Sequence, residues 1–240
     1  EQVCAFQKRP NIELIEADQT LQTQVSEQVI TDIWGLDRID SASKDYDNRY
    51  KYTSTGTGIF AYVVDTGINS KHVDFGSRVR PGFSAIKGSK STEDCNGHGT
   101  HGAGTIGGNI YGAAKNVSLI PVRVLSCSGS GSNSGVIAGL DWILKQSTVA
   151  NTSKVVNMSL GGGISTSLDN TVAKLTNVGI TVVVAAGNSA SNACNSSPAR
   201  AASAITVAAS DSNDAFASFS NFGTCVDIIA PGVAIKSTWV

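Results

Sequence analysis

Short apolar segments alternate with amphipathic segments over most of this chain. The apolar segments are rich in valine, isoleucine and alanine, and they cover residues 59–65, 117–124, 154–158, 180–186, 204–209 and 226–230. Their side chains are apolar at neighbouring positions, which is typical of strands buried on both faces of a parallel sheet. The sequence therefore predicts a sheet of mostly parallel strands with a cover on each side.

Helical patterns occupy two of the intervals between these strands. In one, apolar side chains share a face after the capping serines of segment 132–134; they are Val136, Leu140, Ile143 and Leu144. In the other, Leu168, Val172 and Leu175 share a face, and Gly179 ends the pattern. Strand and helix in repeated alternation predict an α/β fold, a doubly wound and mostly parallel sheet with helices on both faces.

Three polar or glycine-rich segments follow predicted strands directly. Asp65 ends the first strand, the sequence SLGGG at 159–163 follows another, and AAGN at 185–188 follows a third. Functional sites of such sheets lie at the carboxyl ends of the strands, so we expect these segments to converge at one edge.

A fourth segment, DCNGHGTHGAG at 94–104, places His98 between Gly97 and Gly99 where a loop turns into a helix. An imidazole titrates near neutrality and can act as a general base, and flanking glycines let a substrate backbone approach. A histidine in a glycine-rich turn is often only a turn residue. Asp65 and Asn188 also have turn or capping roles as their commoner explanation; beside a cleft, they would orient the imidazole and stabilise an oxyanion.

Composition and charge narrow the class of protein. Lysine and arginine number 18 against 19 aspartates and glutamates in 240 residues, without runs of like charge, which disfavours nucleic acid or an anionic membrane as partner. No apolar stretch is long enough to span a bilayer, and one main domain is expected. Met158 is the single methionine, so we expect that Glu1 is not the start of translation.

The chain has five cysteines and no CxxC pattern, which disfavours a zinc site. Four of them lie in or beside loops rich in glycine, serine and asparagine: Cys95, Cys127, Cys194 and Cys225. This placement suits two disulfides in an oxidising compartment, and it favours a secreted, extracellular protein.

The motifs, taken in order, resemble a known family. VVDTGI, NGHGTHGAGTIGG, NMSLGGG, VVVAAGN, SPAR and SFSNFGTCVDIIAPG are similar to segments of the subtilisin-like serine peptidases, in the proteinase K branch and closest to the aqualysin type. The resemblance runs from about residue 34 to residue 240. It implies a secreted endopeptidase with broad apolar or aromatic preference, in which Asp65 orients His98 and Asn188 binds the oxyanion.

The same resemblance implies residues that bind the substrate. Segments on the two sides of the cleft would pair with an extended peptide, and small residues would form the floor of the pocket for the residue before the scissile bond. The two sides are Gly129, Ser130 and Gly131, and Ser159, Leu160 and Gly161; the floor is Ala185, Ala186 and Gly187.

The nucleophile of the family is absent from this sequence. The family carries it in a GTSMA segment, and the chain stops at STWV without one, so we expect the chain as given to be inactive. Residues 1–24 resemble the end of an inhibitory propeptide with a linker, and residues 25–240 resemble a peptidase domain that is incomplete at its C-terminus. The expected partners are peptide substrates and the propeptide, which acts as inhibitor and folding aid; the expected state is a monomer.

The resemblance also implies disulfides and calcium. It pairs Cys95 with Cys127 and Cys194 with Cys225. It makes Asp227 a ligand of a structural Ca²⁺ together with the backbone carbonyls of Ala202 and Ala204, although Asp227 could merely cap a strand end. Asp37 and Asp40 could form a second calcium site. No catalytic cofactor is expected.

Two other functions remain open from the sequence. The missing serine would suit a non-catalytic pseudoprotease or binding protein on the same fold. A metallohydrolase could use His98 and His101, which are three residues apart, although His72 is the one remaining histidine and no third ligand lies at a recognised spacing.

Overall fold

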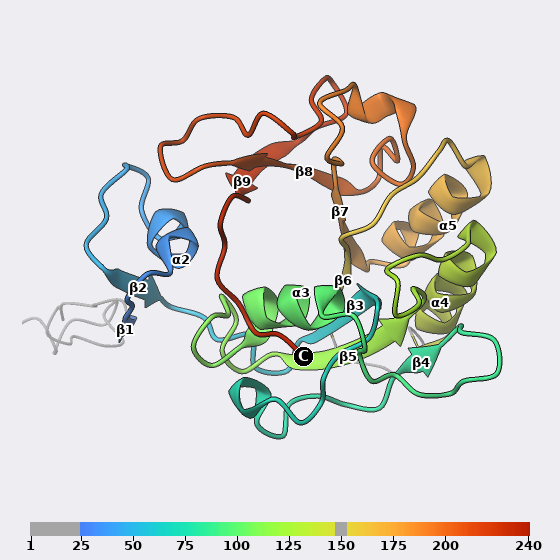
Figure 1. The fold of residues 1–240 in the computed structure, drawn as a ribbon, viewed down its shortest axis with the longest axis horizontal. Coiled ribbons are helices and arrows are strands. Elements are labelled where there is room, and N and C mark those ends of the chain that lie inside the picture. The colour runs from blue at the N-terminus through green and yellow to red at the C-terminus, as the bar shows by residue number, and fades with distance from the viewer. Residues whose placement is uncertain (1–24, 147–152) are drawn as a thin grey trace, which may run out of the picture.

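The computed structural model describes residues 25–146 and 153–240 of the chain. Its centre is a seven-stranded sheet with the order β4-β5-β3-β6-β7-β8-β9, in which every pair of neighbours is parallel (Figure 1). The strands are β3 (Phe60–Asp65), β4 (Phe83–Ser84), β5 (Ser118–Arg123), β6 (Lys154–Met158), β7 (Thr181–Ala185), β8 (Ile205–Ser210) and β9 (Ile228–Pro231). The predicted doubly wound α/β sheet is confirmed.

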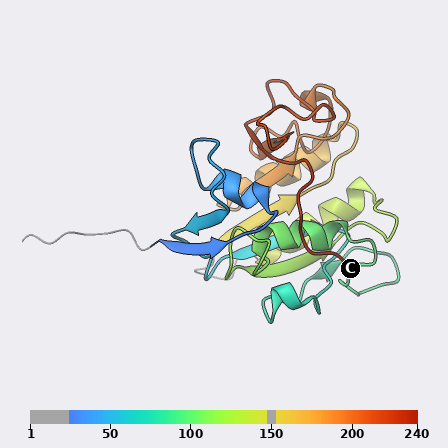
Figure 2. The ribbon, with the colours of Figure 1, turned by 60° about the vertical axis from the view of Figure 1, so that its left-hand side comes forward.

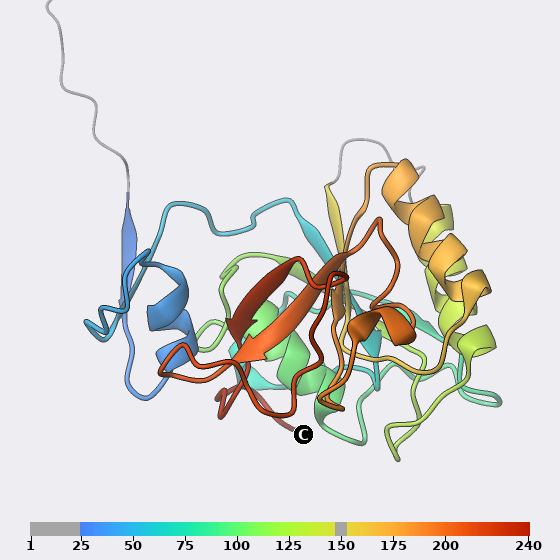
Figure 3. The ribbon, with the colours of Figure 1, turned by 90° about the horizontal axis from the view of Figure 1, so that it is seen from above.

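Helices cover the two faces unequally. Helices α4 (Asn133–Gln146) and α5 (Thr166–Asn177) pack on one face, whereas α3 (His98–Gly107) lies on the other (Figure 3). Helix α4 begins as its sequence predicts, because the hydroxyl of Ser132 accepts a hydrogen bond from the amide of Gly135. Ser165, to which the sequence assigned no role, caps α5 by accepting a hydrogen bond from the amide of Leu168. Gly179, with φ of 85°, follows the end of α5.

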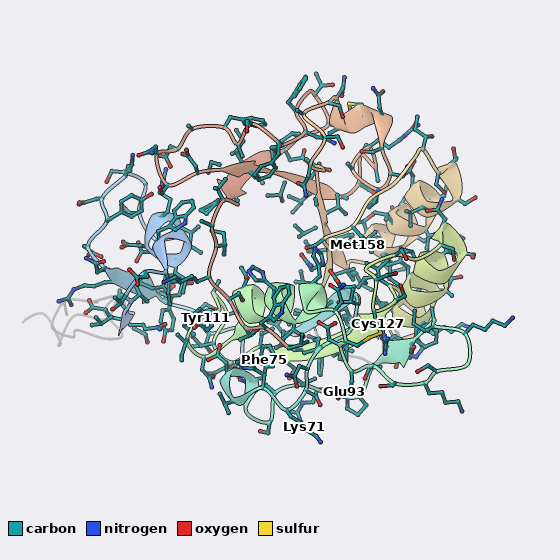
Figure 4. All side chains as sticks on the ribbon, viewed as in Figure 1. Lys71, Phe75, Glu93, Tyr111, Cys127 and Met158 are labelled. Atoms are coloured by element: carbon teal, nitrogen blue, oxygen red, sulfur yellow. A yellow bond between two sulfur atoms is a disulfide. The ribbon has the colours of Figure 1, made fainter. Side chains whose placement is uncertain are left out.

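The two faces of the sheet therefore have separate cores. Under α4 and α5, the fully buried side chains include Val156, Met158 and Leu175. Under α3, a smaller core joins Val63, Leu119 and Phe75, the last from the 3-10 turn η1 (Val73–Phe75). Figure 4 labels Phe75 and Met158 within these two cores.

The expectation that the strands are buried on both faces is correct for β3 and β5 but wrong for β7, β8 and β9. Alternate residues of β7 and β8 are partly exposed, and Ile228 and Ile229 of β9 are 54% and 52% exposed. The physical reason is that α3 covers only the β3 and β5 end of its face. Farther along, a cavity of about 450 Å³ borders Val183, Val207 and Ala209.

The N-terminal part of the described chain forms a small unit beside the sheet (Figure 2). It contains β1 (Ser26–Val29), α2 (Trp34–Ile39) and β2 (Arg49–Tyr52), and β1 pairs with β2 antiparallel. Its own core joins Ile30, Leu36 and Tyr50. The predicted propeptide remnant with its linker, residues 1–24, and the fifth cysteine, Cys4, lie outside the described residues.

The C-terminal segment, residues 232–240, runs from β9 to α3 (Figure 1). The hydroxyl of Thr238 donates to the carbonyl oxygen of Thr100 at 2.7 Å, and that of Ser237 donates to the carbonyl oxygen of His101 at 2.8 Å. On the way, the indole nitrogen of Trp34 in α2 donates to the carbonyl oxygen of Val233 at 3.2 Å. This segment thus connects the N-terminal unit to α3.

Candidate active site

Asp65 and His98 meet at the carboxyl edge of the sheet. Asp65 is the last residue of β3 and His98 the first residue of α3, and Nδ1 of His98 lies 2.7 and 2.8 Å from the two carboxylate oxygens of Asp65. The carboxylate is fully buried, and Oδ1 also accepts a hydrogen bond from the amide of Thr66. The side chain of His98 is 51% exposed, so one face of the ring is open to a ligand.

The charge of Asp65 favours the imidazolium form of this histidine. The hydrogen bond to Asp65 raises the pKa of His98 above its ordinary value, and partial burial opposes the effect without cancelling it. Because Nδ1 faces the carboxylate, the proton of the neutral ring is held there and Nε2 is left free to accept one. The pair can therefore take a proton from a group that approaches the exposed side of the ring.

Asp94 and two glycines fix the start of α3. Asp94 accepts hydrogen bonds from the amides of Asn96, Gly97 and Thr100 and from the hydroxyl of Thr100, at 2.7 to 3.0 Å. Gly97 has φ of 111°, and a Cβ atom there would lie 2.3 Å from the indole of Trp239. A Cβ atom at Gly99 would lie 2.2 Å from the carbonyl oxygen of Gly67, so β3 and α3 can approach each other closely only with glycine at this position.

The two predicted sides of the substrate cleft face a common cavity. The cavity measures about 450 Å³ and its lining includes Asn96 and His98 with residues 129–131 on one side and 159–162 on the other. Leu125, Val136 and Leu168 give it an apolar wall. The structure thus brings all six predicted cleft residues together with His98.

The predicted floor of the pocket borders a neighbouring cavity of about 340 Å³. Its lining contains residues 159–162 and 185–189, so Ala185, Ala186, Gly187 and Asn188 lie together beside Ser159. Asn188 is exposed at the edge of this cavity.

A residue to which the sequence assigned no role holds this pocket in shape. Asn221 is 4% exposed, its Oδ1 accepts hydrogen bonds from the amides of Ser189 and Ser191, and its Nδ2 donates to the carbonyl oxygen of Ala186. A Cβ atom at Gly187 would lie 2.4 Å from Nδ2 of Asn221. The motif SNFG contains Asn221, but nothing local in that motif indicates a partner more than 30 residues earlier.

Both disulfides form with the pairing that the resemblance implies. Cys95 joins Cys127, and Cys194 joins Cys225. The first bridge links the segment before His98 to the rim at residues 129–131, and Figure 4 labels Cys127 at this position. Asn96 strengthens the link, because its Nδ2 donates to the carbonyl oxygen of Cys127 at 2.9 Å while its Oδ1 accepts the amide of His98.

The two candidate calcium sites differ in the hydrogen bonds that their carboxylates accept. Oδ2 of Asp227 accepts the amide of Thr206 at 2.8 Å, which fixes the carboxylate beside the start of β8, close in sequence to the carbonyls of Ala202 and Ala204. All three groups are hard oxygen donors of the kind that Ca²⁺ prefers. Asp37, by contrast, is 3% exposed and accepts hydrogen bonds from the amides of Asp47 and Asn48. Asp40 accepts a hydrogen bond from the amide of Lys51, so both carboxylates hold a loop.

The other two histidines have structural partners. Nε2 of His101 lies 3.0 Å from the carbonyl oxygen of Ile235, and Nδ1 of His72 accepts the amide of Asp74 and caps η1. Within residues 25–146 and 153–240, no three side chains of His, Cys, Asp or Glu are grouped so that they could hold a metal ion. A metallohydrolase site at His98 and His101 therefore has no support from the described residues.

Comparison with known proteins finds a matching family model and relatives that are named as proteinases. The model of the subtilase family, Peptidase S8, matches residues 56–239. The chain is 53% identical over 239 residues to an extracellular serine proteinase of Thermus sp. (strain Rt41A), covering all of this chain and 57% of the relative. It is 47% identical over 230 residues to proteinase T of Parengyodontium album, and this match covers 95% of this chain and 77% of the relative. The chain thus spans a little over half the length of the Thermus relative.

A solved structure has the same fold. It is described as a cold adapted subtilisin-like serine proteinase, with a TM-score of 0.83 and 52% identity, and the match covers 86% of this chain and 75% of that one.

Across the part of the chain that the structure describes, no helix is both long and apolar enough to cross a membrane.

Proposed function

Because this chain belongs to the subtilase family, we propose that the complete protein is a secreted serine endopeptidase. The contact between His98 and Asp65 at the head of an open cleft is the observation that carries this proposal. The proposal includes a nucleophilic serine that meets the exposed side of His98. It also assigns residues 1–24 to a propeptide with its linker and residues 25–240 to the peptidase domain.

The mechanism is acyl transfer. Nε2 of His98 takes the proton of the serine hydroxyl as the oxygen attacks the scissile carbonyl, and Asp65 stabilises the imidazolium through Nδ1. The side chain of Asn188 donates to the tetrahedral oxyanion. His98 then returns the proton to the leaving amine. In the second half of the reaction, water attacks the acyl group with His98 again as the general base, and the serine leaves with the proton that His98 returns.

The cleft favours an extended peptide. Residues 129–131 and 159–161 present glycine backbone on either side, which can pair with a third strand from the substrate. Ala185, Ala186 and Gly187 leave room for a large side chain in the neighbouring pocket, and among the described residues no charged one lines that pocket. We therefore expect apolar or aromatic residues before the scissile bond.

Loss of the histidine tests the proposal. In the full-length protein, expressed from the complete coding sequence, His98→Ala abolishes hydrolysis of an aromatic peptide anilide. In subtilisin, another member of the family, loss of the corresponding group costs about 10⁶-fold in kcat. His72→Ala is the matched control and retains activity, since His72 caps η1. Hydrolysis by the His98→Ala protein would contradict the proposal.

The rival functions have tests of their own. A stop codon directly after Val240 in the transcript would favour a pseudoprotease on the same fold. A metallohydrolase would lose activity with a zinc chelator and survive a serine-directed phosphonylating reagent, whereas we expect the reverse.

Calcium has a structural role in this proposal. Asp227 and the carbonyl oxygens of Ala202 and Ala204 would hold the ion and so join β8 to the segment before β9; the ion takes no part in the chemistry. Chelation with EGTA lowers the melting temperature of the native protein and not that of Asp227→Asn. An unchanged melting temperature in both would remove this site.

A further inference from the structure

A buried arginine lies under one of the two disulfides. Arg123, the last residue of β5, is 7% exposed, and its Nη2 lies 3.0 Å from Sγ of Cys95 and 3.5 Å from Sγ of Cys127. Its Nη1 donates to the carbonyl oxygens of Glu93 at 3.0 Å and Ser91 at 3.3 Å. In the described ranges no carboxylate forms an ion pair with it, and its Nε is buried without a hydrogen-bond partner. The positive charge of Arg123 is therefore directed at the two sulfur atoms.

The second disulfide lacks this arrangement. Sγ of Cys194 lies 3.6 Å from the hydroxyl of Thr224, which is neutral. Cys194 and Cys225 are half-buried, whereas Cys95 and Cys127 are exposed. The chain thus contains an exposed bridge next to a cation and, as an internal control, a half-buried bridge next to a hydroxyl.

A neighbouring cation changes how a disulfide exchanges with thiols. It stabilises a thiolate, and a sulfur whose thiolate is stabilised is the better leaving group. Arg123 is closer to Cys95 than to Cys127, so Cys95 leaves more readily and the incoming thiol attacks the other sulfur.

We propose that Cys127 is a site of S-thiolation by low-molecular-mass thiols, with Cys95 as the leaving thiolate held by Arg123. The thiolate of the incoming thiol attacks Sγ of Cys127, the Cys95–Cys127 bond breaks, and its electron pair goes to Cys95. A mixed disulfide remains on Cys127. A second thiol can then release Cys127 as a free thiol, and the two reductant molecules leave as one disulfide, so two electrons are transferred in all.

The location gives this exchange a consequence for the cleft. The bridge joins Cys95, three residues before His98, to the turn in which the amide of Ser126 donates to the carbonyl oxygen of Ser130. Residues 129–131 of this turn form one side of the cavity that contains His98. Opening of the bridge frees this side to move, so thiolation at Cys127 weakens substrate binding. This last step rests on the proposed function, whereas the exchange does not.

The exchange is tested with 2-mercaptoethanol on the full-length protein. Samples are quenched with N-ethylmaleimide at short times, and the cysteine peptides are identified by mass. We expect the thiol on Cys127 and the maleimide on Cys95, and opening of this bridge about tenfold faster than that of Cys194–Cys225. Equal rates for the two bridges, or the thiol on Cys95, would overturn the proposal.

Two variants isolate the charge. Arg123→Gln keeps a polar side chain and loses the cation, so we expect opening to slow about tenfold and the preference for Cys127 to disappear. Arg123→Lys retains the charge and most of the rate. An Arg123→Gln protein that opens as fast as the native one would contradict the role of the guanidinium. If this variant does not fold, the position of the incoming thiol in the native protein, on Cys127 or on Cys95, still decides.

The effect on the cleft has separate readouts. On thiolation, hydrogen exchange of the amides in residues 126–131 becomes faster, and KM for a peptide substrate rises more than kcat falls. Unchanged exchange and unchanged KM in fully thiolated protein would refute the coupling to the cleft. A native protein that hydrolyses nothing before thiolation contradicts only the proposed function.

Discussion

Both carboxylate oxygens of Asp65 lie within hydrogen-bonding distance of Nδ1 of His98, at 2.7 and 2.8 Å. The pKa of His98 is raised by this hydrogen bond, so the pair stabilises the folded state below the ordinary histidine pKa of 6.5, and its contribution is lost as the pH rises through the raised value. We predict that Asp65→Asn lowers the pKa of His98 in an NMR titration. In the full-length peptidase proposed above, we expect the same substitution to lower kcat by about 3 × 10⁴-fold, as loss of the corresponding aspartate does in subtilisin.

A second histidine variant is the control for this titration. The residue for it is His72, which caps η1, and we expect His72→Ala to leave the titration of His98 as it is in the native protein. An unchanged His98 titration in Asp65→Asn would contradict the electrostatic role of Asp65.

Two glycines of α3 give a second prediction because they differ only in their surroundings. A Cβ atom at residue 104 would lie 2.3 Å from Oγ1 of Thr238 and 2.4 Å from Oγ of Ser237, whereas at residue 102 the nearest atom is 3.9 Å away. Gly104→Ala is expected to displace the C-terminal segment and to cost about 1–3 kcal/mol in the free energy of unfolding. Gly102→Ala is expected to gain up to about 1 kcal/mol by helix propensity.

Urea denaturation of the two variants checks this prediction. Equal stabilities for Gly102→Ala and Gly104→Ala would show that the C-terminal segment does not press on α3.

Asp94 makes the fold sensitive to acid. Burial raises the pKa of Asp94, but the hydrogen bonds from Thr100 and from the amides of Gly97 and Asn96 outweigh burial and lower the pKa below its ordinary value. The stability from this group is therefore present above pH 3.8 and is lost as the pH falls through the lowered value. We predict that Asp94→Asn costs about 2 kcal/mol at neutral pH, measured by urea denaturation, and less at pH 3.

Asp45→Asn is the matched control, because Asp45 is exposed, and it leaves the stability nearly unchanged. A loss of equal size at pH 7 and pH 3 for Asp94→Asn would refute the role of the charge.

Lys115 gives a second rise of stability with pH, at the alkaline end of the range. It is 8% exposed, its Nζ donates to the carbonyl oxygen of Ile110 and lies 5.4 Å from the centre of the Tyr50 ring, and burial lowers its pKa to about 8. The charge of Asp74 opposes this lowering of the pKa, and that of Arg78 adds to it. Between pH 8 and the ordinary 10.5, the unfolded chain binds more protons than the folded one, so stability from this residue rises with pH.

Lys115→Met removes this rise. The free energy of unfolding is measured by urea denaturation at pH 7.5 and at pH 10. We expect the difference in this free energy between the native protein and the variant to change by about 1–3 kcal/mol over this interval. The exposed Lys90→Met leaves the pH profile of the native protein in place. A Lys115→Met profile parallel to the native one would contradict this assignment.

The sequence indicates those parts of the site whose signals are local. A strand that ends in Asp65 and a glycine-flanked His98 can be read from a few residues each, and parallel strands bring such ends to one edge. The capping serine of α4 and the glycine after α5 are local signals too, and each places one end of its helix correctly.

Long-range support could not be predicted from the chain. Asn221 acts on a loop more than 30 residues earlier, and Arg123 acts on the segment before His98 from the neighbouring strand. Each looks like an ordinary loop or strand residue until the fold supplies its partners. The exposure of β9 could not be predicted for a related reason. Ile228 and Ile229 are apolar and so predict a buried strand, but the sequence does not show which element packs on them.

The bond between Trp34 and Val233 has a consequence for biosynthesis. These two residues are 199 positions apart, so the N-terminal unit leaves the ribosome long before its partner segment exists. At about 5 to 20 residues per second, it waits roughly 10 to 40 seconds with one flank uncovered. The nascent chain therefore has a long interval in which a chaperone can bind the α2 surface.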